Sequence, residues 1–335
     1  MTIEPVLSVE GLNVWFDGDV SPAHVVRDVS FEVRPGEILA IVGESGCGKS
    51  VTAMTLLGLT RSRNARFSGT VRFGEHELLS LSEPELRAVR GAGISMVFQD
   101  PLTSLNPVMT VGAQIEEMLR LHLPISRSTA RRRAVEMLET VGIADADRRA
   151  RQFPHEFSGG MRQRAMIAMA MSCNPPVLIA DEPTTALDVT IQAQILELIT
   201  SLAHDRGSAV ILITHDLGVV AETADVVAVM YAGEIVELAT RDDLFSAPQH
   251  PYTWGLLASI PRVDQPRTDR LPSIEGQPPS PSAVLSGCGF RDRCAFAFEA
   301  CAAHPLLEER SSNRHLDRCQ LPVSGREEQR RAIYP

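Results

Sequence analysis

The stretch Gly43-Glu44-Ser45-Gly46-Cys47-Gly48-Lys49-Ser50 decides the fold, because it fits the pattern G-x-x-x-x-G-K-[ST] in full. It follows the apolar run EILAIV and precedes VTAMTLLGL, so it joins a buried strand to a helix. Its glycines let backbone N–H groups turn inward around phosphate oxygens, and the helix points its positive end at the same anion. Lys49 would reach the β- and γ-phosphates, and the Ser50 hydroxyl would bind Mg²⁺. The stretch therefore predicts an α/β fold with a nucleotide-phosphate site.

Two side chains in this loop stand out. The chain has 32 basic residues, and all of them except Lys49 are arginines. A position that keeps lysine against this bias indicates a need for a compact ammonium group. Cys47 lies beside a helix N-terminus, where a thiol can become acidic and redox-sensitive. We favour the simpler interpretation, in which Cys47 is a tolerated small side chain.

The composition is ordinary for a soluble globular protein. The chain has 335 residues and a mass of 36.5 kDa, with 44% hydrophobic and 22% charged residues. This length predicts roughly two domains. The first residues do not resemble a signal peptide, and no apolar run approaches the ~20 residues of a membrane helix, so we expect a cytoplasmic chain. The net charge of −10, without a dominant basic patch, argues against nucleic acid as a partner.

Polar residues follow two further apolar strands. The strand at 177–181 ends in Asp181 and Glu182, and the strand at 211–213 is followed by Thr214 and His215. Asp181 can hold Mg²⁺, and Glu182 can orient or deprotonate an attacking water. Because α/β sheets bind ligands at the carboxyl ends of their strands, His215 is a candidate for a γ-phosphate contact.

A second anion-binding element is predicted at Ser158-Gly159-Gly160, which opens a helix. One nucleotide site does not need two such elements. A head-to-tail dimer does, since the second element of each chain could close over the nucleotide of the other. The sequence therefore predicts a dimeric nucleotide site.

The hydropathy pattern and the proline content change along the chain. Residues 7–42 predict an antiparallel strand region, and residues 100–159 predict an α-helical insert in a core built from the flanking segments. After residue 255 the chain becomes rich in proline. We therefore expect one domain at 1–255, followed at 256–335 by a linker and a cysteine-bearing module.

Taken in order, these motifs resemble those of ABC-transporter ATP-binding subunits over about residues 5–260. Gly43–Ser50 match the Walker A loop, Ser158–Gly160 the signature and Val177–Glu182 Walker B. The remaining matches are Gln99 in the Q-loop, Thr185-Ala186-Leu187-Asp188 in the D-loop, and His215 as the switch histidine. The resemblance implies a P-loop NTPase (RecA-like) core with an antiparallel β subdomain, an α-helical insert and a C-terminal Cys-rich module.

The resemblance also implies a site that hydrolyses ATP, with Mg²⁺ as cofactor. The resemblance assigns catalytic roles to Glu182, His215, Lys49 and Gln99. It implies that Ser50, Gln99 and Asp181 would hold Mg²⁺. The nucleotide-binding positions are Phe16, Gly43, Ser45, Gly46, Cys47, Gly48, Lys49, Ser50, Val51, Ser158, Gly159, Gly160 and Asp188.

Two positions depart from the family's commonest pattern. The signature reads FSGGM rather than LSGGQ. The aromatic residue that stacks on adenine is usually tyrosine, whereas Phe16 stands here beside Trp15. The face of a phenylalanine ring can still stack on a base. The alternative is that Phe16 is a core residue of its strand.

Three segments indicate the subfamily. VFQDPLTSLNPVMTVGAQI at 97–115, HPYTWGLLASIP at 250–261 and the cysteine module resemble the dipeptide/oligopeptide and nickel importers. This implies peripheral association with the cytoplasmic face of the plasma membrane and two transmembrane permease subunits. It also implies a second ATPase subunit, which favours a heterodimer, and an extracytoplasmic solute-binding protein. The alternatives are an importer of nickel or another small solute, or a soluble ABC ATPase that does not transport.

Four of the six cysteines cluster as C-x5-C-x6-C-x17-C, at Cys288, Cys294, Cys301 and Cys319. Zinc sites favour closer pairs, and an iron–sulfur cluster also takes four thiolates. Members of the family that this chain resembles carry a [4Fe–4S] cluster on a similar pattern, so the resemblance implies this cofactor. Zinc, a disulfide or unligated thiols are the alternatives, with His304 and His315 as other possible ligands.

Overall fold

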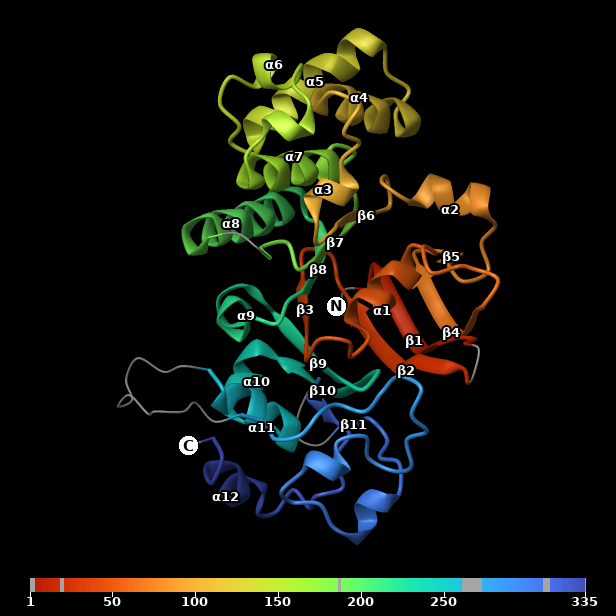
Figure 1. Ribbon diagram of the computed structural model, residues 1–335, viewed down its shortest axis with the longest axis vertical. Helices are drawn as coiled ribbons and strands as arrows, with labels where there is room; N and C mark the ends of the chain where they lie inside the picture. The colour runs from red at the N-terminus through yellow and green to blue at the C-terminus, as the bar shows by residue number, and fades with distance from the viewer. Residues whose placement is uncertain (1–3, 19–20, 186–187, 261–272, 310–313, 335) are drawn as a thin grey trace. The chain divides into compact units, whose positions relative to one another are not determined.

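The computed structural model describes residues 4–18, 21–185, 188–260, 273–309 and 314–334, and its contacts divide the chain into two compact units (Figure 1). Unit 1 consists of Met1–Leu7, Glu32–Ile38 and Arg72–Ile213. Unit 2 consists of Ser8–Phe31, Leu39–Val71 and Thr214–Pro335. Each unit therefore gathers segments that are far apart in the sequence.

Three parallel strands form the sheet portion of unit 1. They are β6 (Ile94–Val97), β7 (Val177–Asp181) and β8 (Ala209–Ile213), with β7 in the middle. Every residue of these strands is buried. Such continuous apolar runs are typical of parallel strands that are covered on both faces. Polar residues that follow these strands are therefore placed at one edge of the sheet.

The helices of unit 1 fill the stretch for which the sequence predicts an insert, and continue beyond it. Helices α4, α5 and α7 pack pairwise against one another (Figure 1). In chain order the helices are α2 (Glu83–Val89), α3 (Pro101–Ser104), α4 (Val111–His122), α5 (Arg127–Thr140), α6 (Ala146–Arg149), the 3-10 helix η1 (Pro154–Glu156), α7 (Gly159–Met171) and α8 (Val189–Arg206).

Unit 2 contains most of a four-stranded sheet of order β2-β1-β4-β5. Its strands are β1 (Leu7–Phe16), β2 (Ala23–Val33), β4 (Ala65–Phe73) and the short β5 (His76–Glu77). On β1, buried Leu7, Val9, Leu12 and Val14 are separated by more exposed residues. This alternation is that of a strand with one covered face.

A second sheet portion of unit 2 begins at the strand before the phosphate loop. Its order is β11-β12-β10-β9-β3, in which β3 and β9 are parallel and the remaining neighbours are antiparallel. The strands are β3 (Ile38–Val42), β9 (Val226–Tyr231), β10 (Glu234–Thr240), β11 (Glu308–Glu309) and β12 (Leu316–Asp317). The helices are α1 (Lys49–Leu56), α9 (Leu217–Thr223), α10 (Arg241–Ser246), α11 (Pro251–Ala258), η2 (Arg291–Arg293), η3 (Glu299–Ala302) and α12 (Arg326–Arg331).

The C-terminal segment is built into unit 2 through strand β12. Asp317 pairs in register with Glu237 of β10, and the buried Arg318 donates to the Ile235 carbonyl and to the Asp28 carboxylate. Phe290 shares one core cluster with the sheet residue Tyr231. The cysteine module therefore belongs to the same compact unit as the phosphate loop.

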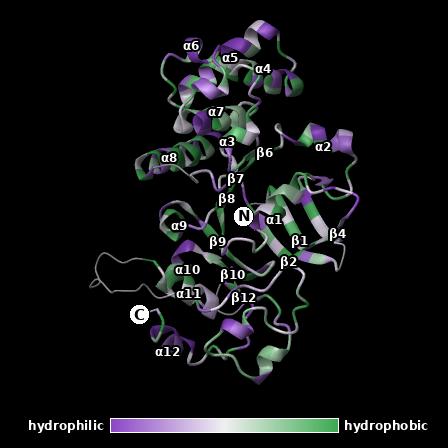
Figure 2. Ribbon diagram, viewed as in Figure 1, coloured by the Kyte–Doolittle hydropathy of each residue, from purple (hydrophilic) through white to green (hydrophobic). Residues whose placement is uncertain are grey.

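Hydropathy follows this architecture. Figure 2 shows hydrophobic residues along β7, β8 and β9, whereas α6 and α12 are largely hydrophilic. Among the described residues, none of the helices has both the length and the apolar character needed to cross a membrane.

Candidate functional site

The phosphate loop follows the buried strand β3 and depends on glycine for its path. Gly43 has φ +153°, and a Cβ atom there would lie 2.1 Å from the Met230 carbonyl oxygen. Gly48 has φ +106° and caps the N-terminus of α1. Residues with a side chain rarely adopt these conformations. Glycine is therefore required by the backbone conformation at both positions and, at Gly43, also by the close approach of β9.

Lys49 lies inside this loop. Its Nζ atom donates to the carbonyl oxygens of Gly43 at 2.7 Å and Glu44 at 3.0 Å, and it lies 3.8 Å from the Cys47 sulfur. The side chain is buried, and the compact ammonium fits among three close partners. The structure thus places the chain's single lysine within its phosphate-binding motif.

Cys47 is buried in the same loop. Burial raises the pKa of its thiol, and the nearby Lys49 charge offsets this only in part. A thiol that is buried and largely protonated is a poor redox sensor. This environment favours the interpretation of Cys47 as a small packing side chain.

In unit 2, His215 lies close in the chain to a residue that is hydrogen-bonded to β3, the strand that leads into the phosphate loop. The Thr214 N–H donates to the Ile41 carbonyl of β3 at 3.3 Å, so the chain at 214–215 runs beside the strand that enters the phosphate loop. Asp216 then caps α9, where its carboxylate accepts from the Gly218 N–H at 2.9 Å. The exposed His215 is therefore held between a buried strand pairing and a helix cap.

In unit 1, Glu182 is held by two side chains at the end of β7. Gln99 Nε2 donates to Glu182 Oε2 at 3.0 Å, and Thr185 Oγ1 donates to the same oxygen at 2.9 Å. Glu182 has φ +44°, a left-handed conformation that is costly for a residue with a side chain. Such strain concentrates at functional sites. Asp181, the preceding residue, is buried.

The signature residues open helix α7 in unit 1. The exposed Ser158 caps the helix, with its Oγ accepting from the Met161 N–H at 3.4 Å. A Cβ atom on Gly160 would lie 3.1 Å from Ile191 of α8, so the glycine permits close packing. Asp188 caps α8 by accepting from the Ile191 N–H at 3.0 Å. Of the predicted D-loop, Ala186 and Leu187 lie outside the described residues.

Phe16 is the last residue of β1 and is half-buried. Its neighbour Trp15 is engaged, because the Trp15 and His24 rings stack with centroids 4.5 Å apart. Burial, together with the Arg27 charge, lowers the pKa of His24 to about 4, so this stack is neutral at physiological pH. Phe16, the residue predicted to stack on adenine, is thus partly exposed.

The structure groups the predicted residues by unit. The phosphate loop, Phe16 and His215 lie in unit 2. Gln99, Asp181, Glu182, Ser158 and Asp188 lie in unit 1, where Gln99 and Glu182 are in direct contact. Each unit therefore carries one half of the predicted machinery.

The four C-terminal cysteines share one neighbourhood. The pKa values of Cys288, Cys294 and Cys319 are raised to about 11, first by burial and also by the charges of neighbouring cysteines. All six cysteines of the chain lie in the described residues, and none forms a disulfide. The thiols of Cys288, Cys294 and Cys319 are therefore protonated at physiological pH.

The predicted iron–sulfur site gains no support from this geometry. Within the described part of the chain, no three His, Cys, Asp or Glu side chains are grouped so that they could hold a metal ion. The alternative histidine ligands are engaged elsewhere: His304 pairs with Glu234 at 2.7 Å and His315 with Glu237 at 2.8 Å. The donor set thus does not fit a single metal ion.

Two contacts to the phosphate loop could not be predicted from the sequence. The Tyr252 hydroxyl accepts from the Glu44 N–H at 3.0 Å, and Arg293 forms an ion pair with the Glu44 carboxylate at 2.8 Å. Both partners come from the region after β10. No local pattern connects Glu44 with a residue 249 positions away, and only the fold reveals the pair.

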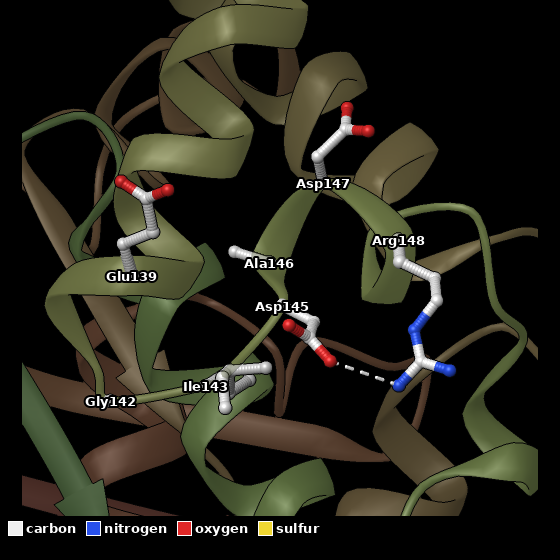
Figure 3. Close-up of a pocket in the computed structure, with 8 residues that line it drawn as sticks. Glu139, Gly142, Ile143, Asp145, Ala146, Asp147 and Arg148 are labelled. Atoms are coloured by element: carbon white, nitrogen blue, oxygen red, sulfur yellow. Dashed lines mark hydrogen bonds and ion pairs between the residues drawn. The ribbon is translucent and has the colours of Figure 1, made fainter.

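A surface pocket of about 740 Å³ lies in unit 1, around the loop that joins α5 to α6 (Figure 3). Glu139, Asp145 and Asp147 contribute carboxylates, and Asp145 pairs with Arg148 at 3.1 Å. None of the predicted site residues lines it. This pocket is therefore separate from the motif residues.

Two family models match the chain. The model described as ABC transporter matches residues 26–185, and the one described as Oligopeptide/dipeptide transporter, C-terminal region, matches residues 236–301. The first match spans the phosphate loop, the signature and Walker B, and the second includes Cys288, Cys294 and Cys301.

Curated proteins match over most of the length of both chains. A probable peptide ABC transporter ATP-binding protein of Sinorhizobium fredii is 54% identical, with 91% of each chain covered. A dipeptide transport ATP-binding protein of Bacillus subtilis is 52% identical, with 89% of each chain covered. An oligopeptide transport ATP-binding protein of Salmonella typhimurium is 50% identical, covering 95% of this chain and 94% of its own.

Solved structures match the cassette. A dimeric ATP-binding cassette in a post-hydrolysis state with ADP and Pi has a TM-score of 0.63 and 27% identity, covering 70% of this chain and 98% of its own. A subunit of the ABC transporter complex cbiONQ from Clostridium perfringens has a TM-score of 0.61 and 26% identity, covering 73% and 92%.

Proposed function

The chain belongs to the ABC transporter family of ATP-binding subunits, and we propose that it is the ATP-hydrolysing motor of a peptide importer. The observation that carries the proposal is the joint match to the cassette and to the oligopeptide/dipeptide C-terminal region. The similarity to solved structures of ATP-binding cassettes confirms the predicted α/β cassette fold. Relatives named for peptide, dipeptide and oligopeptide transport support peptides as the solute class.

The phosphate loop would hold the triphosphate of ATP. Its backbone N–H groups and the N-terminus of α1 provide the positive end of a helix for the anion. The Lys49 ammonium, which lies against the Gly43 and Glu44 carbonyls, would turn toward the β- and γ-phosphates. Phe16, which is partly exposed, would stack on the adenine ring.

The carboxylates at the C-terminal end of β7 would take part in hydrolysis. Gln99 and Thr185 hold the Glu182 carboxylate in place, so Glu182 would accept the proton of the attacking water. Ser50, Gln99 and Asp181 would hold Mg²⁺, which neutralises developing phosphate charge. His215 would donate to the γ-phosphate from the end of β8.

A second cassette would complete the site. The N-terminus of α7 is exposed at Ser158 and Gly159, as it must be if it closes over the nucleotide of another subunit. Asp188 lies at the start of the neighbouring helix α8. We propose a heterodimer with a related ATPase, as the resemblance of the motifs to the peptide importers implies.

A surface in unit 1 has exposed apolar residues that could bind the permease. Leu102 and Val108, which follow Gln99, are 61% and 79% exposed. A groove of about 180 Å³ in the same part of unit 1 is lined by Ser104, Asn106, Met109, Gln114, Glu117, Met118, Leu121 and Met169. Flexible methionine side chains adapt to an inserted apolar helix. We propose that a cytoplasmic helix of the permease binds here, which would place the chain at the cytoplasmic face of the membrane.

The membrane partners follow from the same proposal. Two permease subunits would form the path for the peptide, and an extracytoplasmic binding protein would deliver it. The peptide would then never contact this chain, so its sequence and length preference would be set by the partner proteins.

An iron–sulfur cluster in the C-terminal module is a separate proposal, and no step of hydrolysis depends on it. It is supported by the sequence alone, in which four cysteines occur between residues 288 and 319, since [4Fe–4S] clusters take four thiolates. The grouping of the described residues does not support it. Iron and acid-labile sulfide would be measured after anaerobic purification, and sub-stoichiometric amounts of both would refute it.

The importer proposal is tested by purification from the native host. The tagged chain is solubilised from membranes in mild detergent, and co-purifying proteins are identified by mass spectrometry. We expect two multi-span permease subunits and a second ATPase in stoichiometric yield. Uptake of a labelled peptide should then depend on Glu182, with Glu182→Gln as the inactive control. Recovery from the soluble fraction with ribosomal or DNA-repair proteins, and without a permease, would overturn the proposal.

A further inference from the structure

A bidentate ion pair joins the cysteine module to the phosphate loop. Arg293 Nη1 and Nη2 donate to the two carboxylate oxygens of Glu44 at 2.8 and 3.0 Å. The Arg293 side chain is 7% exposed and the Glu44 side chain 26%. Charge-assisted, two-pronged pairs of this kind are strong and geometrically specific. Glu44 is the second residue of the loop that would hold the nucleotide phosphates.

The guanidinium is fixed from several sides. It lies 5.7 Å from the ring centre of Tyr231 and 6.0 Å from that of Phe290. Its Nε donates to the Glu275 carbonyl at 2.9 Å, and its Nη1 reaches the Tyr231 hydroxyl at 3.3 Å. Arg293 therefore cannot leave the pair without breaking several contacts.

The loop is braced by the same cluster. The Tyr252 hydroxyl accepts from the Glu44 N–H, and the Tyr231 and Tyr252 rings are in contact with centroids 4.6 Å apart. Met230, which precedes Tyr231, contributes the carbonyl that excludes a side chain at Gly43. The backbone of Glu44 is thus held by Tyr252, a residue of the core cluster on which the cysteine module packs, and its carboxylate is held by Arg293 of the module itself.

The charge of Glu44 matters because ATP is a polyanion. An unpaired carboxylate in the loop would repel the phosphates, whereas the paired one is neutralised by Arg293. Arg293 directly precedes Cys294, so the guanidinium is positioned by the module that carries the four thiols.

We propose that Arg293 is a positioning residue for nucleotide binding, which neutralises Glu44 and so links the C-terminal module to the ATP affinity of the phosphate loop. The proposal rests on the proposed function, because it assumes that the loop binds ATP. It assigns no catalytic role to Arg293, which acts on the nucleotide only through Glu44.

A double-mutant cycle tests this link in the full chain, with its partner subunits if these are needed for solubility. Arg293→Gln should raise the KM for ATP, and the dissociation constant of a fluorescent ATP analogue, by roughly tenfold, while kcat stays within about twofold. Glu44→Gln in the Arg293→Gln background should restore most of the affinity, because no unpaired carboxylate remains. Arg291→Gln is the matched control, since Arg291 is exposed on the same 3-10 helix η2.

Salt dependence separates this role from a structural one. The loss of affinity in Arg293→Gln should shrink as ionic strength rises, because salt screens the Glu44 carboxylate. A fall in kcat and in melting temperature at unchanged KM, without rescue by Glu44→Gln, would overturn the positioning role. Failure of the unaltered chain to bind ATP would instead overturn the proposed function and, with it, this inference.

Discussion

The phosphate loop and the four-cysteine module lie in the same compact unit, but different kinds of atoms define them. The loop is defined by backbone, through glycines at 43 and 48 with positive φ values. The module is defined by side chains from distant positions, such as Cys319, which packs with Trp254 and Leu321. A site made of backbone can be recognised from a short motif, whereas a site made of side chains needs the fold.

The cysteines show the difference in their packing. Cys288 and Cys294 pack against the core cluster that contains Tyr231, whereas Cys319 is buried in another cluster with Trp254 and Leu321. Spacing in the sequence gives no hint of this division. The comparison predicts that changes in the loop impair nucleotide chemistry, while changes of the buried cysteines in the module act first on stability.

The largest effect should come from Glu182→Gln. We expect ATP hydrolysis to fall by about a hundredfold or more with ATP binding retained, because the amide cannot accept the proton of the attacking water. Steady-state phosphate release and binding of a fluorescent ATP analogue measure the two quantities. Glu222→Gln, an exposed change on α9, is the control. Unchanged turnover in Glu182→Gln would contradict the assignment of the base.

Gly43→Ala tests the backbone definition of the loop. Its Cβ would lie 2.1 Å from the Met230 carbonyl oxygen, so β9 or the loop must move. We expect loss of measurable nucleotide binding and a cost of about 1–3 kcal/mol in the free energy of unfolding. Gly36→Ala is the control, because it has a positive φ of +72° but no atom within 4 Å of the added Cβ. Similar nucleotide affinities in the two variants would break the comparison.

Cys319→Ser tests the side-chain definition of the module. Cys319 is buried beside Trp254 and Leu321, and a hydroxyl there is less favourable than a thiol. We expect the free energy of unfolding to fall by about 1 kcal/mol, as measured by denaturant titration. Cys173→Ser, at a half-buried position of unit 1, should cost less. Equal losses in both variants would show that burial of Cys319 in the module contributes no more to the free energy of unfolding than the half-buried position of Cys173.

The smallest effect should be a pH-dependent one at His315. Burial lowers the pKa of this histidine, but its hydrogen bond to Glu237 and the charges of Glu237, Asp243 and Asp317 outweigh that, and the pKa is raised above 6.5. Its contribution to stability is therefore complete below about pH 6.5 and is lost as the pH rises through the raised value.

The measurement compares melting temperatures of the unaltered chain and His315→Gln from pH 5.5 to 9. The difference between them should be largest at the acidic end and should shrink toward the alkaline end. His76→Gln, an exposed change, controls for the loss of one histidine. A difference that grows with pH would contradict the assigned direction.

The strand-end positions of the candidate site residues could be predicted from the sequence, for an identifiable reason. Glu182 and His215 each follow a buried strand, and strand ends in α/β folds lie at one edge of the sheet. Gln99 was predicted from the resemblance; the structure places it in contact with Glu182, and its role stays a prediction.

Other features could not be predicted, because they depend on long-range packing. The Arg293–Glu44 pair and the Tyr252 hydroxyl on the Glu44 N–H join residues with no local relation in the sequence. The domain boundary at 255 stays a prediction. In the structure, the pairing of β12 with β10 nevertheless carries the chain across that point into the same unit.

The pairing of β12 with β10 has a consequence for synthesis. Glu237 and Asp317 are register partners, and His315 and Arg318 also anchor to β10. On the ribosome, β10 therefore emerges long before its outer neighbour and presents an open strand edge that carries a carboxylate destined for burial. Such edges invite pairing with other chains. This part of the nucleotide-binding unit is therefore complete only after β12 has been synthesised.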